Sequence, residues 1–162
     1  MKATTTKVLF VCLGNICRSP LAEAIFKKKV DEKGLTQYFE VASCGTANYH
    51  IGDSPDPRTI SNARKNGVSI DHLGRQLHHN DLEEFDLILA MDESNLRNIH
   101  RLPNAHQHSH KIKLMRGYDP LAEGDEVPDP YYGSEEDFQH VFDILNSANE
   151  HLLLQLQKQL KL

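Results

Sequence analysis

The feature that most constrains this chain is a short apolar run that leads through a tight loop into a helix. Residues 8–11, Val-Leu-Phe-Val, have the composition of a buried strand. Gly14 and Asn15 follow, and both residue types accept the positive φ angles of a tight turn. Ser19 suits the cap of a helix and Pro20 its first position. The segment therefore predicts a strand, a loop and a helix in immediate succession.

This succession predicts an anion site at the start of the helix. The N–H groups of such a loop surround one small volume, and the helix dipole adds partial positive charge there. Cys12 opens the loop and Arg18 closes it, so a thiol and a guanidinium would face the same anion. Because these positive surroundings favour the thiolate, Cys12 is interpreted as a nucleophile. A cysteine at a strand end is more often a small buried hydrophobic residue, and the loop around it reverses that interpretation.

The rest of the chain alternates between strands and helices. Further strands are predicted at residues 38–44, 86–91 and 111–115, the last with the alternating lysines of an edge strand. Helices are predicted from Ser54 to about Asn66, from the cap Asp92 to about Pro103, and from a capping box at residues 134–137 to the last residues. Between residues 68 and 85 we expect a short extended piece near Arg75 and one helical turn near Asp81.

The alternation predicts an α/β fold: a single three-layer domain over residues 1–162, with an open, mostly parallel sheet and helices on both faces. Such sheets bind ligands outside the carboxyl ends of their strands. The loops after Val11, Cys44, Met91 and Met115 would all leave the sheet at that edge. The proline-containing stretch 116–133 is predicted to be a long loop, and long loops in compact domains are often functional.

Charge and cysteine content restrict the possible partners. A formal net charge of −5 and a pI near 6.0 give no basic surface for nucleic acid or an anionic membrane. No apolar stretch approaches the length needed to span a membrane, and three cysteines without zinc spacing are typical of a reducing compartment, so a cytoplasmic location is expected. No cofactor or metal is expected, and the alternating His106, His108 and His110 are interpreted as a solvated loop.

The loop also resembles that of a known family. Residues 12–19, Cys-Leu-Gly-Asn-Ile-Cys-Arg-Ser, closely resemble the phosphate loop of the low-molecular-weight protein tyrosine phosphatases. The similarity recurs at residues 91–95, Met-Asp-Glu-Ser-Asn, and at residues 129–133, Asp-Pro-Tyr-Tyr-Gly, and extends from about Lys7 to the final helix. The resemblance implies a four-stranded parallel sheet with the phosphate loop after its first strand.

The resemblance also implies roles for individual residues. It makes Arg18 the clamp on the phosphate oxygens and Asp129 the general acid; without it, Asp129 would be interpreted as a turn-forming residue before a proline. The loop residues expected to bind the substrate phosphate with Cys12 and Arg18 are Leu13, Gly14, Asn15, Ile16, Cys17 and Ser19. The tyrosines expected to wall the entrance, where they would stack on an aryl group, are Tyr49, Tyr131 and Tyr132.

Two further sets of contacts are expected around the loop. Asn15, Ser43 and His72 match positions that in the family form a hydrogen-bond network supporting the loop. Ser19 can cap the helix and also hydrogen-bond the Cys12 sulfur. A disulfide between Cys12 and Cys17 is a hypothesis for protection of the nucleophile. Cys44 is interpreted as a core residue.

These observations predict a metal-independent phosphatase acting on phosphotyrosine in proteins or on small aryl phosphates. Cys12 would attack phosphorus, Asp129 would protonate the phenol, and water would then hydrolyse the cysteinyl-phosphate. We expect a monomer or a weak homodimer.

The sequence leaves three alternative functions to consider. Arsenate reductase shares the loop but needs further cysteines, and none follows Cys44. A protein-arginine phosphatase has a similar loop that typically carries threonine where this chain has Ile16. An inactive phosphoprotein-binding module would need neither Cys12 nor Asp129.

Overall fold

A parallel sheet forms the centre of the computed structural model, which describes residues 4–120, 122 and 125–162. The strand order is β2-β1-β3-β4, and every neighbouring pair is parallel. The strands are β1 (Thr6–Cys12), β2 (Phe39–Gly45), β3 (Leu87–Ala90) and β4 (Ile112–Leu114). The predicted α/β class, with four parallel strands, is confirmed.

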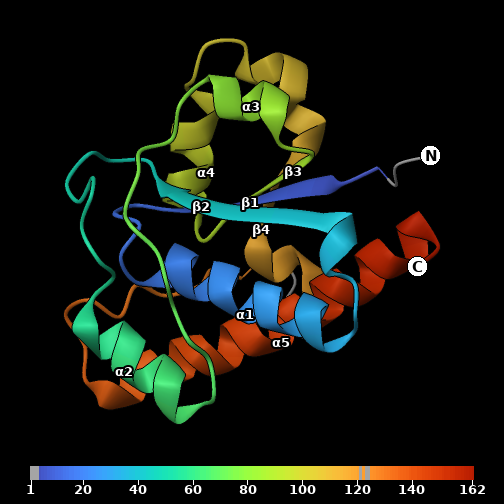
Figure 1. Ribbon diagram of the computed structural model, residues 1–162. Coiled ribbons are helices and arrows are strands. Elements are labelled where there is room, and N and C mark those ends of the chain that lie inside the picture. Colours follow the sequence, from blue (N-terminus) through green and yellow to red (C-terminus); the bar gives the residue numbers. More distant parts are fainter. Residues whose placement is uncertain (1–3, 121, 123–124) are drawn as a thin grey trace.

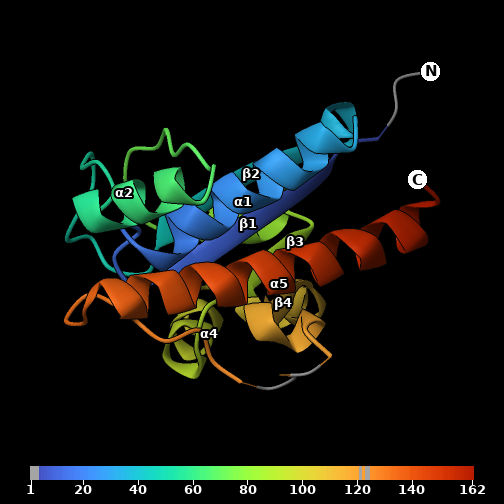
Figure 2. The same ribbon diagram turned by 90° about the horizontal axis from the view of Figure 1, so that it is seen from below.

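Helices cover both faces of this sheet (Figures 1 and 2). One face carries α1 (Arg18–Glu32), α2 (Pro57–Lys65) and α5 (Glu135–Leu160), and the other carries α3 (Asn80–Glu84) and α4 (Glu93–His100). The described residues also form three short 3₁₀ helices: η1 (Thr36–Tyr38), η2 (Ala105–Lys111) and η3 (Met115–Tyr118). The arrangement is the predicted three-layer one.

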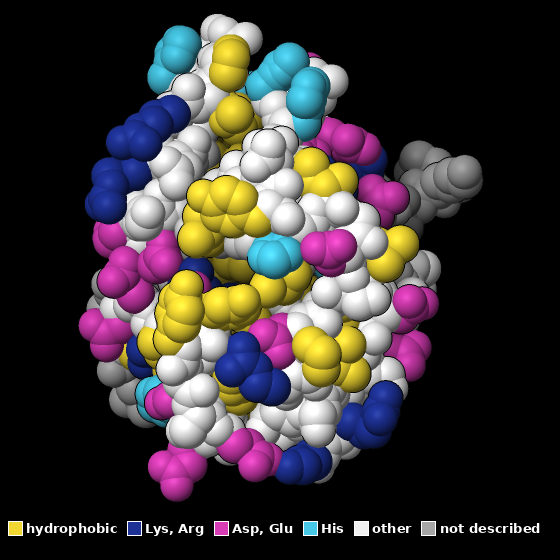
Figure 3. Space-filling view, turned by 90° about the vertical axis from the view of Figure 1, so that its left-hand side faces the viewer, with side chains coloured by type: hydrophobic (Ala, Val, Ile, Leu, Met, Phe, Trp, Pro, Cys, Tyr) yellow, Lys and Arg dark blue, Asp and Glu magenta, His cyan; other side chains and the backbone are white. Residues whose placement is uncertain are grey.

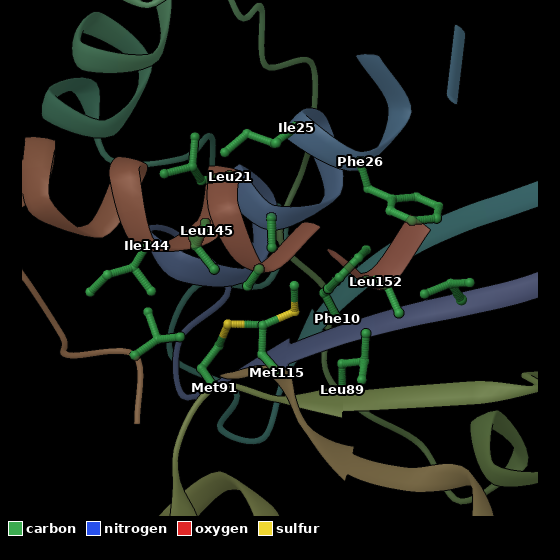
Figure 4. Packing of buried hydrophobic residues seen from close by; sticks show 14 of the residues in the cluster. Phe10, Leu21, Ile25, Phe26, Leu89, Met91, Met115, Ile144, Leu145 and Leu152 are labelled. Atoms are coloured by element: carbon green, nitrogen blue, oxygen red, sulfur yellow. The ribbon is translucent and has the colours of Figure 1, made fainter. Parts of the chain in front are cut away.

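The sheet separates two hydrophobic clusters because strand residues alternate between its faces. Val8 and Phe10 of β1 face α1 and α5, whereas Leu9 and Val11 belong to the cluster beneath α4. In the larger cluster, Phe26 of α1 is fully buried and packs its ring against those of Phe10 and Phe39. Figure 4 shows Met91 and Met115 filling the space between the strands and α5.

Most helix starts follow the predicted capping residues. The Asp92 carboxylate accepts a hydrogen bond from the Asn95 N–H at 2.7 Å, and the Asp137 carboxylate accepts one from the Ser134 N–H, also at 2.7 Å. Asp56 caps α2, and Gly67, with φ of 81°, follows its end. The helical turn near Asp81 is α3, and the extended piece near Arg75 is a single parallel bridge between Gly45 and Gln76.

The predicted start of the first helix is wrong. The helix begins at Arg18, so Pro20 is its third residue, where its missing N–H removes no helical hydrogen bond. The Ser19 side chain does not cap the helix, because its hydroxyl lies 3.0 Å from the Cys12 sulfur and accepts a hydrogen bond from Asn15. The hydroxyl is therefore used by the loop.

Two segments predicted to be loops contain 3₁₀ helices. His106, His108 and His110 lie within η2, and the stretch 116–133 begins within η3. Residues 121, 123 and 124 of that stretch lie outside the described residues. In the part of the chain that the structure describes, no helix is both long and apolar enough to cross a membrane.

We predict that Phe26→Ala lowers the free energy of unfolding by about 3–5 kcal/mol, because it removes a fully buried ring and leaves a cavity. Denaturation by urea measures the change. Leu154→Ala, at a half-exposed position of α5, is the control and should change the value by less than about 0.5 kcal/mol. Equal effects of the two substitutions would contradict the described packing.

Candidate active site

The loop between β1 and α1 turns around the sulfur of Cys12. Asn15 has the positive φ predicted for it, 58°, and its N–H donates to the Cys12 sulfur at 3.3 Å. Gly14 is not among the positive-φ residues; instead it leaves room for the ring of His50, which would lie 3.2 Å from a Cβ at this position. Cys12 itself is buried at the carboxyl end of β1. The loop thus presents the Cys12 sulfur, with the Asn15 N–H directed at it, at the carboxyl edge of the sheet.

Arg18 is held at the other end of this loop by two segments far away in the sequence. Its guanidinium donates to the Asp92 carboxylate at 2.6 Å and to the Val127 carbonyl at 3.0 Å. Burial opposes its charge, but Cys12, Asp92 and Asp129 together raise the pKa of Arg18 above its usual value. The arginine therefore stays charged and cannot swing away from the loop.

A hydrogen-bond network lies behind the loop and includes the predicted supporting residues. The Asn15 amide donates to Ser19 at 2.8 Å and to Ser43 at 3.1 Å. The amide oxygen of Asn15 lies 2.6 Å from the His72 ring and accepts a hydrogen bond from the Arg75 N–H. Since Ser19 already accepts from Asn15, its single hydroxyl hydrogen can be donated either to the Cys12 sulfur at 3.0 Å or to the Cys44 carbonyl at 3.3 Å. The network thus connects the support of the loop to its reactive atom.

Glu23 ends this network and was not predicted from the sequence. Its carboxylate is buried and accepts a hydrogen bond from Ser43 at 2.6 Å. The same carboxylate forms an ion pair with Lys27 at 2.5 Å and lies 3.4 Å from the His72 ring, whose pKa is lowered chiefly by burial. A buried carboxylate needs such partners, so Glu23 fixes the orientation of Ser43. An acid on a helix gives no sequence signal for this role.

The loop opens into a cavity of about 270 Å³ at the carboxyl edge of the sheet. Figure 3 looks onto this edge and shows hydrophobic side chains around a hollow. The predicted residues that line the cavity are Cys12, Leu13, Gly14, Ile16, Cys17, Arg18, Tyr49, Asp129, Tyr131 and Tyr132. Asn15, Ser19, Ser43 and His72 lie behind the loop, in the network described above. The fold therefore brings together residues predicted from three distant parts of the sequence.

Asp129 lies across the cavity from the loop. Its carboxylate is half-exposed, and one oxygen lies 3.6 Å from the Arg18 guanidinium. The other oxygen accepts a hydrogen bond from the N–H of Tyr131, two residues further on. The turn-forming interpretation and the catalytic interpretation of Asp129 are therefore compatible, because different oxygens serve the two roles.

Two residues that the sequence did not indicate shape the cavity: His50 lines it, and Arg58 supports the lining residue Tyr131 from outside. His50 lines the cavity beside Gly14, and its ring pairs with the Asp53 carboxylate at 3.1 Å. On the opposite side, Arg58 donates to the Tyr131 carbonyl at 2.9 Å, and its guanidinium carbon lies 5.5 Å from the centre of the Tyr131 ring. These contacts fix the walls of the entrance.

The three cysteines are all free thiols in this structure. Cys17 lines the cavity, and burial raises its pKa to about 12, so it is a neutral thiol at physiological pH. Cys44 is fully buried in the smaller hydrophobic cluster, as predicted. A disulfide between Cys12 and Cys17 stays a hypothesis.

A thiol, a guanidinium and a carboxylate around one cavity form the arrangement expected of an enzyme that transfers phosphoryl groups. The family model for low molecular weight phosphotyrosine protein phosphatases matches residues 7–162. The chain therefore belongs to this family, as the resemblance of the loop implied, and it is a hydrolase of the protein-tyrosine-phosphatase type.

Individual relatives agree with this assignment. The human low molecular weight phosphotyrosine protein phosphatase is 45% identical over 139 residues, which cover 85% of this chain and 87% of the relative. The crystal structure of a protein tyrosine phosphatase from Entamoeba histolytica superimposes with a TM-score of 0.91 at 41% identity, covering 98% of this chain and 100% of the other. An arginine phosphatase variant with a phosphorylated active-site serine superimposes with a TM-score of 0.85 at 27% identity, covering 94% and 97% of the two chains.

Asp92 is the unpredicted residue for which the sequence did contain a signal. It lies in the Met-Asp-Glu-Ser-Asn stretch that directly follows β3, at the edge where ligands bind. One carboxylate oxygen caps α4 and the other holds Arg18. The sequence pattern predicts only the helix cap.

We predict that Gly45→Ala weakens anion binding by about tenfold or more, equivalent to about 1.4 kcal/mol. A Cβ at Gly45 would lie 2.8 Å from the Leu13 carbonyl oxygen and 3.1 Å from the Asn15 nitrogen, so it would displace the loop. The affinity for orthovanadate, measured by calorimetry, tests this. Gly117→Ala is the matched control, since a Cβ there meets no atom within 4 Å. Unchanged affinity of the Gly45 variant would contradict the described loop contact.

Proposed function

We propose that this protein hydrolyses phosphotyrosine in proteins, and small aryl phosphates, through a cysteinyl-phosphate on Cys12. The observation that carries the proposal is the convergence of Cys12, Arg18 and Asp129 on one cavity. Relatives of this family are named for the same substrate. The proposed reaction requires neither a cofactor nor a metal.

In the first step, the Cys12 thiolate attacks phosphorus and the bond from phosphorus to the phenolic oxygen breaks. The loop N–H groups and Arg18 stabilise the charge on the equatorial oxygens, which is the electrostatic part of catalysis. Asp129 donates a proton to the leaving phenolate, and its half-exposed position at the cavity wall suits contact with a leaving group. The products are tyrosine and a phosphoryl group on sulfur.

In the second step, water attacks phosphorus, and Asp129, now ionised, accepts a proton from it. The bond between phosphorus and the Cys12 sulfur breaks, and the sulfur leaves as thiolate. Ser19 stabilises this leaving group by donating its hydroxyl hydrogen to the thiolate, which lies 3.0 Å away and is a closer acceptor than the Cys44 carbonyl at 3.3 Å. Inorganic phosphate is released, and the enzyme returns to its starting state.

The walls of the cavity support phosphotyrosine over other phosphorylated residues. Tyr49, Tyr131 and Tyr132 line it, and aromatic rings pack favourably on an aryl leaving group. Ile16 lies in the loop lining and adds apolar surface, where an arginine phosphatase typically carries threonine. A phosphoserine side chain is shorter and would bring its phosphate less deeply toward Cys12.

We also propose a location, a class of substrates and an oligomeric state for the protein. Three free cysteines fit a reducing compartment such as the cytoplasm. The net charge of −5 favours protein or small-molecule substrates over nucleic acid or anionic membranes. We propose that the protein acts as a monomer or a weak homodimer.

Hydrolysis of p-nitrophenyl phosphate in the presence of a chelator and a reductant tests the catalytic assignment. Cys12→Ser should abolish activity, because a serine hydroxyl in this loop is a far weaker nucleophile than a thiolate. Asp129→Asn should lower kcat by about 100- to 10,000-fold, because the leaving phenolate is no longer protonated. Asp143→Asn, at an exposed carboxylate of α5 outside the cavity lining, is the control for loss of a carboxylate.

The leaving group gives a further test of Asp129. Its loss should matter less for p-nitrophenyl phosphate, whose phenolate leaves easily, than for phosphotyrosine itself. Full activity of Cys12→Ser would contradict the proposed nucleophile. Faster hydrolysis of phosphoarginine than of phosphotyrosine peptides would contradict the proposed substrate.

A further inference from the structure

An apolar surface patch lies on two adjoining segments, residues 51–53 and 73–74, which meet the cavity-lining residue His50. Ile51 and Leu73 form this patch, and they are 59% and 65% exposed. Neither side chain belongs to a hydrophobic cluster of the described residues. Exposed apolar patches are common where proteins bind one another. Neither residue lines the cavity. The patch is therefore separate from the catalytic groups.

The two residues belong to segments that are fastened together. Gly52 donates to the Gly74 carbonyl at 2.8 Å, and Gly74 donates to the Asp53 carbonyl at 2.8 Å. The backbones approach so closely that a Cβ on Gly74 would lie 2.2 Å from the His50 carbonyl oxygen. Because these hydrogen bonds flank Ile51 and Leu73, the patch has a fixed position relative to the sheet edge.

The patch is also continuous with the cavity wall. Tyr49 and His50 line the cavity, and Ile51 is the next residue along the chain. His50 packs against Gly14 of the phosphate loop, which ties this segment to the catalytic groups. An extended peptide spans about 3.3–3.6 Å per residue, so side chains within three residues of a bound phosphotyrosine can reach about 10 Å from it. Ile51 is two residues beyond the cavity-lining Tyr49 in the chain, and we infer that the patch lies within this reach.

The charges near the patch favour one class of side chain. Asp53 and Asp71 lie in the same two segments and are exposed. An acidic side chain of a substrate would be repelled there, whereas an apolar side chain would remove Ile51 and Leu73 from water. The Asp53 carboxylate contacts the His50 ring at 3.1 Å.

We propose that the Ile51–Leu73 patch binds an apolar side chain of the protein substrate, close in sequence to its phosphotyrosine. This inference rests on the proposed phosphotyrosine phosphatase function and adds a preference to it. The patch selects phosphoproteins with a residue such as leucine beside the phosphotyrosine over those with an aspartate at the same position.

Phosphotyrosine peptides test the preference. Each peptide carries a single leucine or aspartate at one of the positions within three residues of the phosphotyrosine, in an otherwise constant sequence. At one or more positions, the leucine peptide should have a kcat/KM about threefold or more higher than the aspartate peptide. A closed hydrophobic pocket would give about tenfold or more, and we expect a smaller effect because this patch is open. Equal values at every position would overturn the proposal.

Substitutions in the patch test whether Ile51 and Leu73 cause the preference. Ile51→Ser combined with Leu73→Ser should remove the difference between leucine and aspartate peptides while leaving hydrolysis of p-nitrophenyl phosphate unchanged, because that substrate does not reach the patch. Leu154→Ser, at a half-exposed leucine of α5, is the matched control and should keep the preference. Thermal unfolding of each variant verifies that it is folded. A preference that survives the double substitution would overturn the proposal.

Two further measurements distinguish substrate binding by the patch from an effect on catalysis and from self-association. Fluorescence anisotropy measures binding of the same peptides to the Cys12→Ser variant, in which no turnover takes place. The binding preference is therefore tested independently of the proposed catalytic mechanism. Sedimentation velocity shows whether the patch joins two copies of the chain. If the double substitution changes the sedimentation coefficient and leaves the peptide preference intact, the patch is a self-association surface and the proposal is wrong.

Discussion

The site depends on the hydrogen bonds that hold the loop after β1 in its turn. A loop that turns the Asn15 N–H toward the Cys12 sulfur is unfavourable by itself, since Asn15 adopts a positive φ. The Asn15 amide compensates by joining Ser19 and Ser43, and Glu23 fixes Ser43. The loop is therefore preorganised before any anion binds, which is the condition for strong electrostatic stabilisation of a transition state.

Distant parts of the chain hold the two charged groups of the site. Asp92, after β3, orients Arg18 and also begins α4, so one residue couples the phosphate clamp to the second layer of helices. Asp129 approaches from the opposite side of the cavity, where a turn with Tyr131 fixes its carboxylate. Parallel strands make this convergence possible, because all of their carboxyl ends meet at one edge.

Local patterns predicted the strands, most helix starts and the reactive loop, because these depend on residues that are neighbours in sequence. The apolar run before Cys12 and the cap Asp92 are examples. The start of the first helix was predicted wrongly because the Ser19 hydroxyl, a good cap in isolation, binds the Cys12 sulfur and Asn15 instead. Glu23 and His50 were missed because their roles depend on contacts across long sequence distances.

The central claim is that the phosphoryl group passes through the sulfur of Cys12. Rapid mixing of the enzyme with a phosphotyrosine peptide, quenching in acid within one turnover and mass spectrometry of the digested protein tests it most directly. The account predicts a phosphoryl group on the peptide that contains Cys12, at a level that rises and then falls during the turnover. Release of phosphate with no phosphorylated Cys12 peptide at any quenching time, or with the phosphoryl group on another residue, would contradict it.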